Sequence, residues 1–207
     1  MVTILRKAEH AALASEELSG AVIDLGGHGN SEYVKMFQGE FTRSTANLSP
    51  DADIQCDFEK PLPIPTDSYD VALLINVLEH IFEYRQLLGE THRILKPRGR
   101  IIIIVPFLFP YHASPQDYHR YTHSALERAL TAAGFSDVRV TSLGSGVCAA
   151  RWLFIERLLP SPVRFLSVVA VPLTDILDRA MRGLARAIGK KYQPSDYALG
   201  FKATAIA

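Results

Sequence analysis

The chain has little of what disulfide-stapled, metal-binding or membrane-spanning proteins need. Its two cysteines, Cys56 and Cys148, have neither metal-site spacing nor the pattern of a disulfide framework, which predicts a reducing, cytoplasmic location. The first residues lack the order of a signal peptide, and no uncharged apolar run reaches the roughly 20 residues of a membrane span. Lys plus Arg is 22 and Asp plus Glu is 22, so the zero net charge argues against a nucleic-acid partner.

The glycine-rich stretch at residues 22–30 organises the chain, whose 207 residues suffice for one α/β domain with a buried core. An apolar run ends in Asp24, and the turn Gly-Gly-His-Gly follows at 26–29. This pattern predicts a buried strand that turns sharply into a helix. Glycine lets a ligand approach the backbone, and free N–H groups at a helix start favour polar or anionic groups. A tight turn without a ligand is the alternative interpretation.

Apolar strands alternate with helical patterns along the rest of the chain, which predicts a doubly wound sheet. Strands are predicted at 22–24, 41–46, 53–58, 71–75, 101–105, 137–143 and 197–206, and helices at 4–18, 31–38, 82–95 and 124–133. Ligands of such sheets bind at the carboxyl ends of the strands. One crevice is therefore expected to collect the polar residues that end strands, which are Asp24, Asn47, Asp57 and Asn76.

Several passages resemble class I S-adenosyl-L-methionine (SAM) methyltransferases. Asp24 and the glycines after it resemble the first motif of that family, with a loop one residue shorter. Leu-Glu-His-Ile at 78–81 resembles the stretch after the family's fourth strand, and Leu-Lys-Pro-Arg-Gly at 95–99 resembles the turn before the fifth. The resemblance covers about residues 20–143 and resumes near 197. It implies an α/β, Rossmann-like, seven-stranded, mostly parallel sheet with an antiparallel last strand.

The resemblance also implies SAM as the cofactor. The family usually has an acid at the end of the second strand, where it holds the ribose hydroxyls. Asn47 stands there instead; its amide can still bind hydroxyls, and a plain turn residue is an equal alternative. Asp57 matches the acid that faces the adenine amino group, and Phe58 matches the side chain that packs on the ring. The expected cofactor-binding residues are Asp24, Gly26, Gly27, His28, Gly29, Asn47, Asp57, Phe58 and Asn76.

The segment 106–122 is a long loop rich in aromatic and titratable residues, and loops at this end of a sheet usually carry function. It resembles the His-x-x-Pro-x-Asp-x-x-Arg-Tyr-Thr segment of a bacterial methyltransferase subgroup of unassigned or glycan-related role. His112 is the first candidate for the base that deprotonates an acceptor, with a structural histidine as the alternative. The expected catalytic residues are His112, Asp117 and His119, and the expected substrate-binding residues are His80, Tyr111, Arg120 and Tyr121. Although two of these histidines and Asp117 have metal-ligand chemistry, no metal is expected.

The whole chain, 1–207, is expected to be a single methyltransferase domain, with a helical insertion at 145–195 before the last strand. Helices are predicted at 151–159 and 173–188, with breaks at Pro160, Pro162 and Pro172. The segment has eight basic residues, including Arg164, against three acids. A packed helical cap, a homodimer contact and an interfacial helix on anionic lipid are the interpretations. In the second helix, one apolar face comprises Leu173, Ile176, Leu177, Ala180, Met181, Leu184, Ala187 and Ile188.

These observations predict a SAM-dependent methyltransferase acting on an oxygen, or less favourably a nitrogen, of a small-molecule, sugar or lipid-linked acceptor. The alternative is a degenerate, non-catalytic relative that serves as a binding or scaffold protein. A dehydrogenase fits less well, because the Gly-x-Gly-x-x-Gly spacing is absent. A cytoplasmic location is expected, with peripheral contact to the inner face of the membrane through 151–188 as an extension of it.

Overall fold

The computed structural model describes residues 3–160, 167–191 and 194–207. Its strands are β1 (Gly20–Leu25), β2 (Phe41–Asn47), β3 (Ile54–Gln55), β4 (Tyr69–Ile75), β5 (Leu95–Pro106), β6 (Ser136–Ser145) and β7 (Ala198–Ile206). The α-helices are α1 (Ile4–Leu13), α2 (Tyr84–Ile94), α3 (His123–Ala132), α4 (Val147–Leu158) and α5 (Ser167–Ala187). Short 3-10 helices are η1 (Glu32–Met36), η2 (Leu78–His80) and η4 (Pro194–Tyr197).

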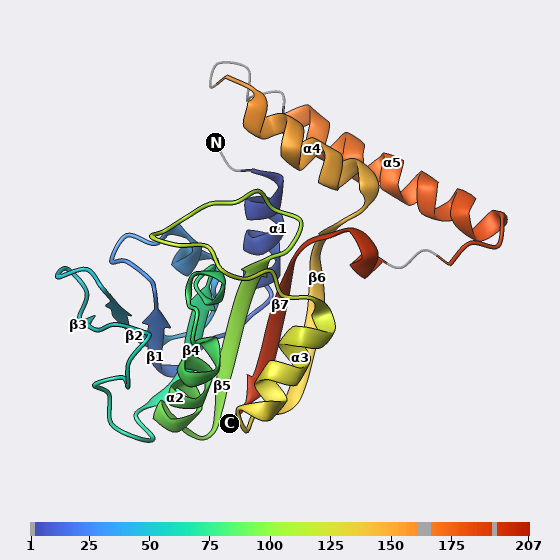
Figure 1. Ribbon diagram of the computed structural model, residues 1–207. Coiled ribbons are helices and arrows are strands. Elements are labelled where there is room, and N and C mark those ends of the chain that lie inside the picture. The colour runs from blue at the N-terminus through green and yellow to red at the C-terminus, as the bar shows by residue number, and fades with distance from the viewer. Residues whose placement is uncertain (1–2, 161–166, 192–193) are drawn as a thin grey trace.

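The seven strands form one sheet in the order β3-β2-β1-β4-β5-β7-β6 (Figure 1). Strands β1 to β5 pair in parallel, whereas β7 runs antiparallel to both β5 and β6. The expected Rossmann-like sheet with an antiparallel last strand is confirmed.

The core consists of two apolar layers, one on each face of this sheet. Because successive side chains of a strand point to opposite faces, the isoleucine run of β5 serves both layers. Ile101 and Ile103 join the layer under α2 and α3, and Ile102 and Ile104 join the layer under α1 and α4. All four are fully buried, as expected for a central strand covered on both sides.

Two predicted helices are wrong in length for one shared reason. The first ends at Leu13 rather than Leu18, and the predicted helix 31–38 is only the 3-10 helix η1. The backbone of Leu18 donates to the carbonyl of Gln38, and the backbone of Gln38 donates to that of Glu16. This tertiary pairing takes backbone groups that longer helices would need. The glycine turn therefore leads into a short 3-10 helix rather than the expected α-helix.

Other boundaries differ by less. The predicted strand 53–58 keeps only Ile54–Gln55. Helix α3 begins one residue before the predicted helix 124–133, and the Thr122 hydroxyl caps it by accepting from the Ala125 N–H. Pro172 lies inside α5 instead of breaking it. Pro162 and Arg164, with the rest of 161–166 and 192–193, lie outside the described residues.

The segment between β6 and β7 folds as a pair of helices, α4 and α5, that extends from one end of the sheet (Figure 1). Helix α4 joins the core through Ala149 and Leu153. The buried carboxylate of Glu156 accepts from the Ile4 N–H at the start of α1. These contacts fasten α4 to the domain at the end of the sheet where β1, β4 and β5 finish.

Candidate functional site

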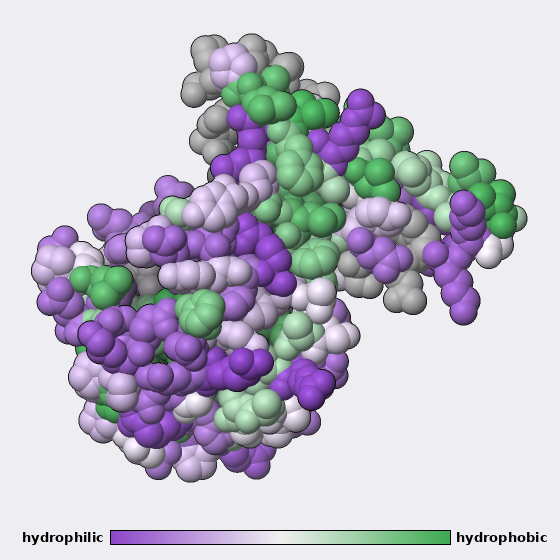
Figure 2. Space-filling view, viewed as in Figure 1, coloured by the Kyte–Doolittle hydropathy of each residue, from purple (hydrophilic) through white to green (hydrophobic). Residues whose placement is uncertain are grey.

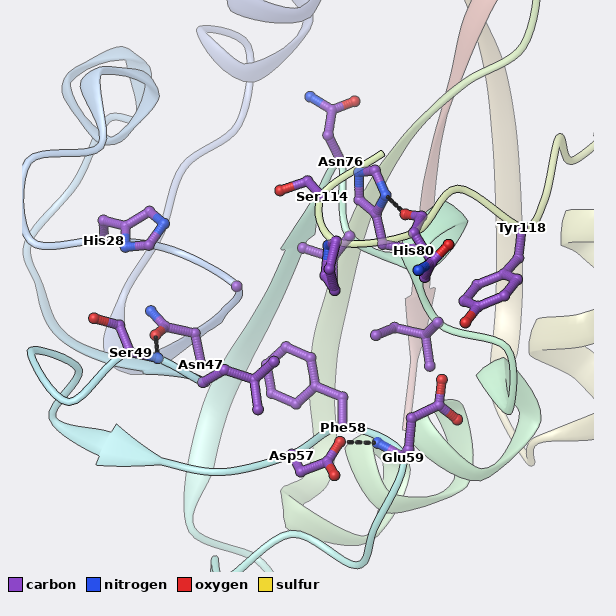
Figure 3. A pocket seen from close by; sticks show the side chains of 16 residues that line it. His28, Asn47, Ser49, Asp57, Phe58, Glu59, Asn76, His80, Ser114 and Tyr118 are labelled. Carbon is purple, nitrogen blue, oxygen red and sulfur yellow. Dashed lines mark hydrogen bonds between the residues drawn. The ribbon is translucent and has the colours of Figure 1, made fainter. Parts of the chain in front are cut away.

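A pocket of about 570 Å³ lies at the carboxyl ends of β1, β2 and β4, where a doubly wound sheet binds its ligands (Figure 3). This size is within the usual range for small-molecule sites. One wall comes from the glycine turn and the ends of β2 and β3, and the other from η2 and the loop 106–122. The lining residues are Gly26, His28, Asn47, Leu48, Ser49, Asp57, Phe58, Glu59, Asn76, Val77, His80, Ile81, Ser114, Pro115, Gln116 and Tyr118.

The glycine turn requires glycine at two of its three glycine positions. Gly26 has φ +92°, and a Cβ there would lie 2.3 Å from the Val77 Cγ2 atom. A Cβ on Gly27 would lie 2.1 Å from the Asp24 carboxylate. At Gly29 a Cβ would meet nothing within 4 Å. Gly26 lines the pocket, whereas Gly27 and Gly29 do not, so their contribution to the site is to shape the turn.

Asp24 lies beneath the turn rather than in the pocket lining. Its carboxylate is fully buried, pairs with Arg43 at 2.8 Å and accepts from the Tyr33 hydroxyl at 2.8 Å. Burial raises the pKa of Asp24 above its usual 3.8, although Tyr33 and Arg43 act in the opposite direction. The Arg43 guanidinium also donates to the carbonyls of His28 and Gly29. Asp24 and Arg43 together therefore hold the shape of the glycine turn.

Asn47 reaches both the pocket and the turn. Its amide nitrogen donates to the Gly27 carbonyl at 2.6 Å. Its side-chain oxygen accepts from the Ser49 N–H at 2.6 Å (Figure 3). The second contact is the turn that asparagine makes with the backbone two residues on. Each end of the amide keeps one further hydrogen-bonding position. Asn47 can therefore serve as a turn residue and still hydrogen-bond the ribose hydroxyls of a cofactor.

Asp57 and Phe58 lie together on the floor of the pocket (Figure 3). One Asp57 oxygen accepts from the Glu59 N–H at 3.0 Å, and the other lies 3.2 Å from the Lys60 ammonium. Chiefly because of the Glu59 N–H, the pKa of Asp57 falls below its usual 3.8, so the carboxylate is ionised at neutral pH. An ionised acceptor beside a buried phenyl ring suits the exocyclic amine and the flat face of adenine.

A cluster of two histidines around a buried carboxylate lies at the opposite wall. Glu79 Oε1 lies 3.7 Å from the Nε2 atoms of both His80 and His112. Neither oxygen of Glu79 has a hydrogen-bond partner among the described residues, and the side chain is fully buried. Because an unpaired buried carboxylate is costly, a positive charge on one of the histidines stabilises this arrangement.

The two histidines of this cluster differ in exposure to the pocket. His80 lines the pocket, and its Nδ1 lies 2.5 Å from the Gln116 carbonyl, so Nδ1 carries the hydrogen (Figure 3). In a neutral imidazole the lone pair is then on Nε2. His112 lies behind it, outside the lining, with ring centroids 5.0 Å apart. The Glu79 carboxylate, opposed by burial and helped by Asp117, raises the pKa of His112 above its usual 6.5.

Asp117 and Arg120 tie the loop 106–122 to itself. Asp117 Oδ2 accepts from the Arg120 Nη2 at 2.6 Å and from the His112 N–H at 2.9 Å. The Arg120 guanidinium also reaches the carbonyls of Phe109 and Pro110. Principally because of Arg120, the pKa of Asp117 falls to about 2. Neither residue lines the pocket, so both are positioned to fix His112 and the loop.

Three other expected site residues lie outside the lining. His119 belongs to an aromatic group with Phe82, Tyr84 and Tyr121. Tyr121 is buried, and its hydroxyl donates to the Leu78 carbonyl. Tyr111 is 70% exposed.

Sequence reasoning missed Glu79 as a site residue, although it lies in the Leu-Glu-His-Ile passage. It also missed Arg43. The available signal was a basic residue inside the predicted strand 41–46, next to the predicted strand that ends in Asp24. The pocket residues that it did not single out are Leu48, Ser49, Glu59, Val77, Ile81, Ser114, Pro115, Gln116 and Tyr118.

The comparisons with known proteins agree with this geometry. Residues 28–103 match the family described as "Methyltransferase domain". A search of curated proteins found no match.

Solved structures with the same fold include two SAM-dependent enzymes. Phosphoethanolamine N-methyltransferase 2 of Haemonchus contortus, solved with S-adenosyl-L-methionine and with phosphomonomethylethanolamine and S-adenosylhomocysteine, aligns at TM-score 0.57 and 17% identity. That alignment covers 96% of this chain but only 52% of the Haemonchus chain, so this chain spans about half of that enzyme. An S-adenosylmethionine-dependent methyltransferase of Mesorhizobium loti aligns at TM-score 0.59 and 18% identity, covering 97% and 98% of the two chains.

A third structure, the [4+2]-cyclase SpnF, aligns at TM-score 0.58 and 16% identity over 98% of this chain and 80% of that chain. At such identities the likeness to solved structures establishes the fold, and the acceptor has to be argued from the site. The pocket fits the cofactor, because Asp57 and Phe58 suit adenine. Gly26 lets a ligand approach the backbone closely, and the Asn47 amide can hydrogen-bond the ribose hydroxyls. The domain match over residues 28–103 and the strand order show that the chain has the fold of class I SAM-dependent methyltransferases.

Proposed function

We propose that the chain methylates an oxygen of a small-molecule, sugar or lipid-linked acceptor, with a nitrogen acceptor as the less favoured case. The observation that carries the proposal is the pocket-lining imidazole of His80 beside the buried Glu79 carboxylate. A hydroxyl must lose its proton as it is methylated, and a fixed histidine is suited to accept it. An amine that is already neutral needs no such group.

In this proposal the pocket residues divide between two ligands. Gly26, Asn47, Asp57 and Phe58 hold SAM, which when bound supplies an electrophilic methyl group on a sulfonium. The acceptor lies toward His80 and the loop residues 114–118. Holding the two ligands in one pocket supplies the orientation that a displacement reaction needs.

The acceptor hydroxyl donates its proton to Nε2 of His80, while the Gln116 carbonyl holds Nδ1–H and so fixes the tautomer. Glu79 stabilises the imidazolium that results, because its carboxylate is buried and 3.7 Å away. His112, on the far side of Glu79, is a positioning residue that balances the carboxylate before the proton arrives. Asp117 holds His112 in turn. His119 contributes packing of the aromatic group.

The nitrogen case comes from the Haemonchus enzyme, whose name describes an N-methyltransferase, but at 17% identity it bears on this chain only through the fold. A panel of hydroxylated sugars, lipid-linked sugars, phenols and amines, assayed with methyl-labelled SAM, separates the two cases. Label transfer to a hydroxyl supports the proposal, and transfer only to amines overturns the preference for oxygen.

The test of the mechanism is the His80→Gln variant. Turnover should fall by about 100-fold or more, the usual size of a general-base contribution, while S-adenosylhomocysteine affinity stays unchanged. His119→Gln is the matched control and should keep the wild-type pH profile. Wild-type turnover in His80→Gln would refute the assigned base.

A further inference from the structure

Helix α5 packs on α4 with its polar side, whereas an amphipathic helix of a globular domain usually buries its apolar side. From Ala170 onward, the residues of α5 that are buried are the polar Thr174 and Asp178, at 7% and 1% exposure. The apolar face predicted from the sequence is largely left exposed, although the Met181 Sδ atom lies 3.8 Å from the Cys148 Sγ atom of α4. Its large members are all exposed, from 42% at Met181 to 64% at Leu184, and they are Leu173, Ile176, Leu177, Met181, Leu184 and Ile188.

Figure 2 shows hydrophobic residues gathered over α4 and α5, whereas the body of the domain is largely hydrophilic in that view. On α4, Phe154 and Leu158 add to the apolar face with 46% and 85% exposure. A contiguous apolar surface of this kind on a soluble domain indicates an interaction site.

The charges beside the apolar face are almost all positive, because two of the three acids are turned inward. Asp178 accepts from the Cys148 and Ala149 N–H groups at 2.9 Å, and Glu156 accepts from the Ile4 N–H. Asp175 is therefore the one exposed acid in the described parts of 147–191. The exposed basic residues of the same segment are Arg151, Arg157, Arg179, Arg186, Lys190 and Lys191.

We propose that α5, with the exposed side of α4, lies on an anionic lipid surface. An amphipathic helix with bulky apolar residues and a cationic border has the composition of interfacial helices, whose apolar face enters the bilayer boundary while the cations meet lipid headgroups. A second copy of the chain is a poorer occupant, because a two-fold contact would bring the same cations together. Among the described residues no helix has the length and apolarity to cross a membrane, so the contact is peripheral.

The helix pair α4 and α5, here called the hairpin, also contacts the loop that forms the acceptor wall of the pocket. The Arg157 guanidinium lies 4.8 Å above the Phe109 ring, and Leu108 and Phe109 pack against the apolar layer that contains Leu153. A membrane bound by the hairpin therefore lies at the end of the domain where the pocket loop is held. The lipid contact does not depend on methyl transfer, and it is consistent with the lipid-linked class of acceptor.

The test is cosedimentation of the full chain with vesicles of neutral phosphatidylcholine and with vesicles that also contain phosphatidylglycerol. Binding should be strong only to the anionic vesicles and should weaken with salt. The variants Ile176→Asp/Leu184→Asp and Arg179→Glu/Arg186→Glu should each reduce that binding at least about tenfold. The first removes apolar contact with the bilayer, and the second reverses the charge that meets the lipid headgroups.

The matched controls are Phe82→Asp, an apolar side chain that is 58% exposed outside α4 and α5, and Arg128→Glu on α3. Both should bind vesicles like the wild type, and all variants should keep the wild-type circular dichroism spectrum. The proposal is overturned if anionic and neutral vesicles bind equally, or if the hairpin variants bind like the wild type. It is also overturned if the wild type ignores vesicles and is a dimer that Ile176→Asp/Leu184→Asp dissociates.

Discussion

Removing the Arg43 side chain should destabilise the protein through the buried carboxylate of Asp24. In Arg43→Met, Asp24 would keep only the Tyr33 hydroxyl while remaining fully buried. Breaking a buried ion pair from one side typically costs about 3–5 kcal/mol, because a charge stays buried without its partner. For a chain of this length, each kcal/mol lowers the melting temperature by about 2–4 °C, so a fall of at least about 6 °C is expected.

The double variant Asp24→Asn/Arg43→Met tests the cause. It removes both charges, so it should recover most of the stability that the single variant loses. The pH dependence gives a second test. Loss of Arg43 raises the pKa of Asp24 further, so the folded form of the variant binds a proton more readily than its unfolded form. Its deficit against the wild type should therefore be largest at neutral pH and shrink as pH falls toward that pKa.

Urea unfolding of the wild type, Arg43→Met and the double variant, each at pH 7 and pH 5, measures both effects. A loss below 1 kcal/mol in Arg43→Met, or a double variant no more stable than the single one, would refute the role of the pair. The single variant should also bind S-adenosylhomocysteine more weakly, because Arg43 holds two carbonyls of the glycine turn.

Three further predictions concern the turn, the histidine cluster and metals. Gly26→Ala should lose about 1–2 kcal/mol or more in thermal unfolding, because alanine is strained at φ +92° and meets Val77, whereas Gly29→Ala should match the wild type within about 0.5 kcal/mol. The pKa of His112 in the folded protein is raised above 6.5, so the charged histidine stabilises the fold fully below pH 6.5 and loses this effect as pH rises through the folded pKa. The stability deficit of His112→Gln in urea unfolding should therefore shrink as pH rises. A deficit that grows with pH would contradict the assignment. Glu79, His80 and His112 have the spacing of a metal site, but a protonated histidine is enough to balance the Glu79 carboxylate. Treatment with a chelator should therefore leave methyl transfer unchanged. Loss of activity that Zn²⁺ restores would disprove this.

The sheet could be predicted because its signals are local. Strands β1, β4 and β5 each contain an apolar run, and β5 is buried on both faces, as its unbroken isoleucines indicate. The pocket position follows from the strand ends, so Asn47, Asp57 and Asn76 meet in one lining as expected.

Side-chain direction could not be predicted in the same way. Asp24 ends a strand like the others, yet its carboxylate turns under the sheet edge because Arg43 and Tyr33, distant by 19 and nine positions, receive it there. Periodicity correctly finds the apolar stripe of α5. It does not reveal that the opposite, polar side of the helix packs on α4, because that choice depends on Asp178 reaching the start of α4.

The measurement that tests the central claim most directly is calorimetric titration with S-adenosylhomocysteine of the wild type, Asp57→Ala and Asp51→Ala. Asp57 lines the pocket, and Asp51 is an exposed acid nearby in the sequence that does not. The wild type and Asp51→Ala should bind in the micromolar range, and Asp57→Ala about tenfold or more weakly, as expected for a lost hydrogen bond to a charged group. No binding by the wild type, or equal binding by all three, would contradict a SAM site in this pocket.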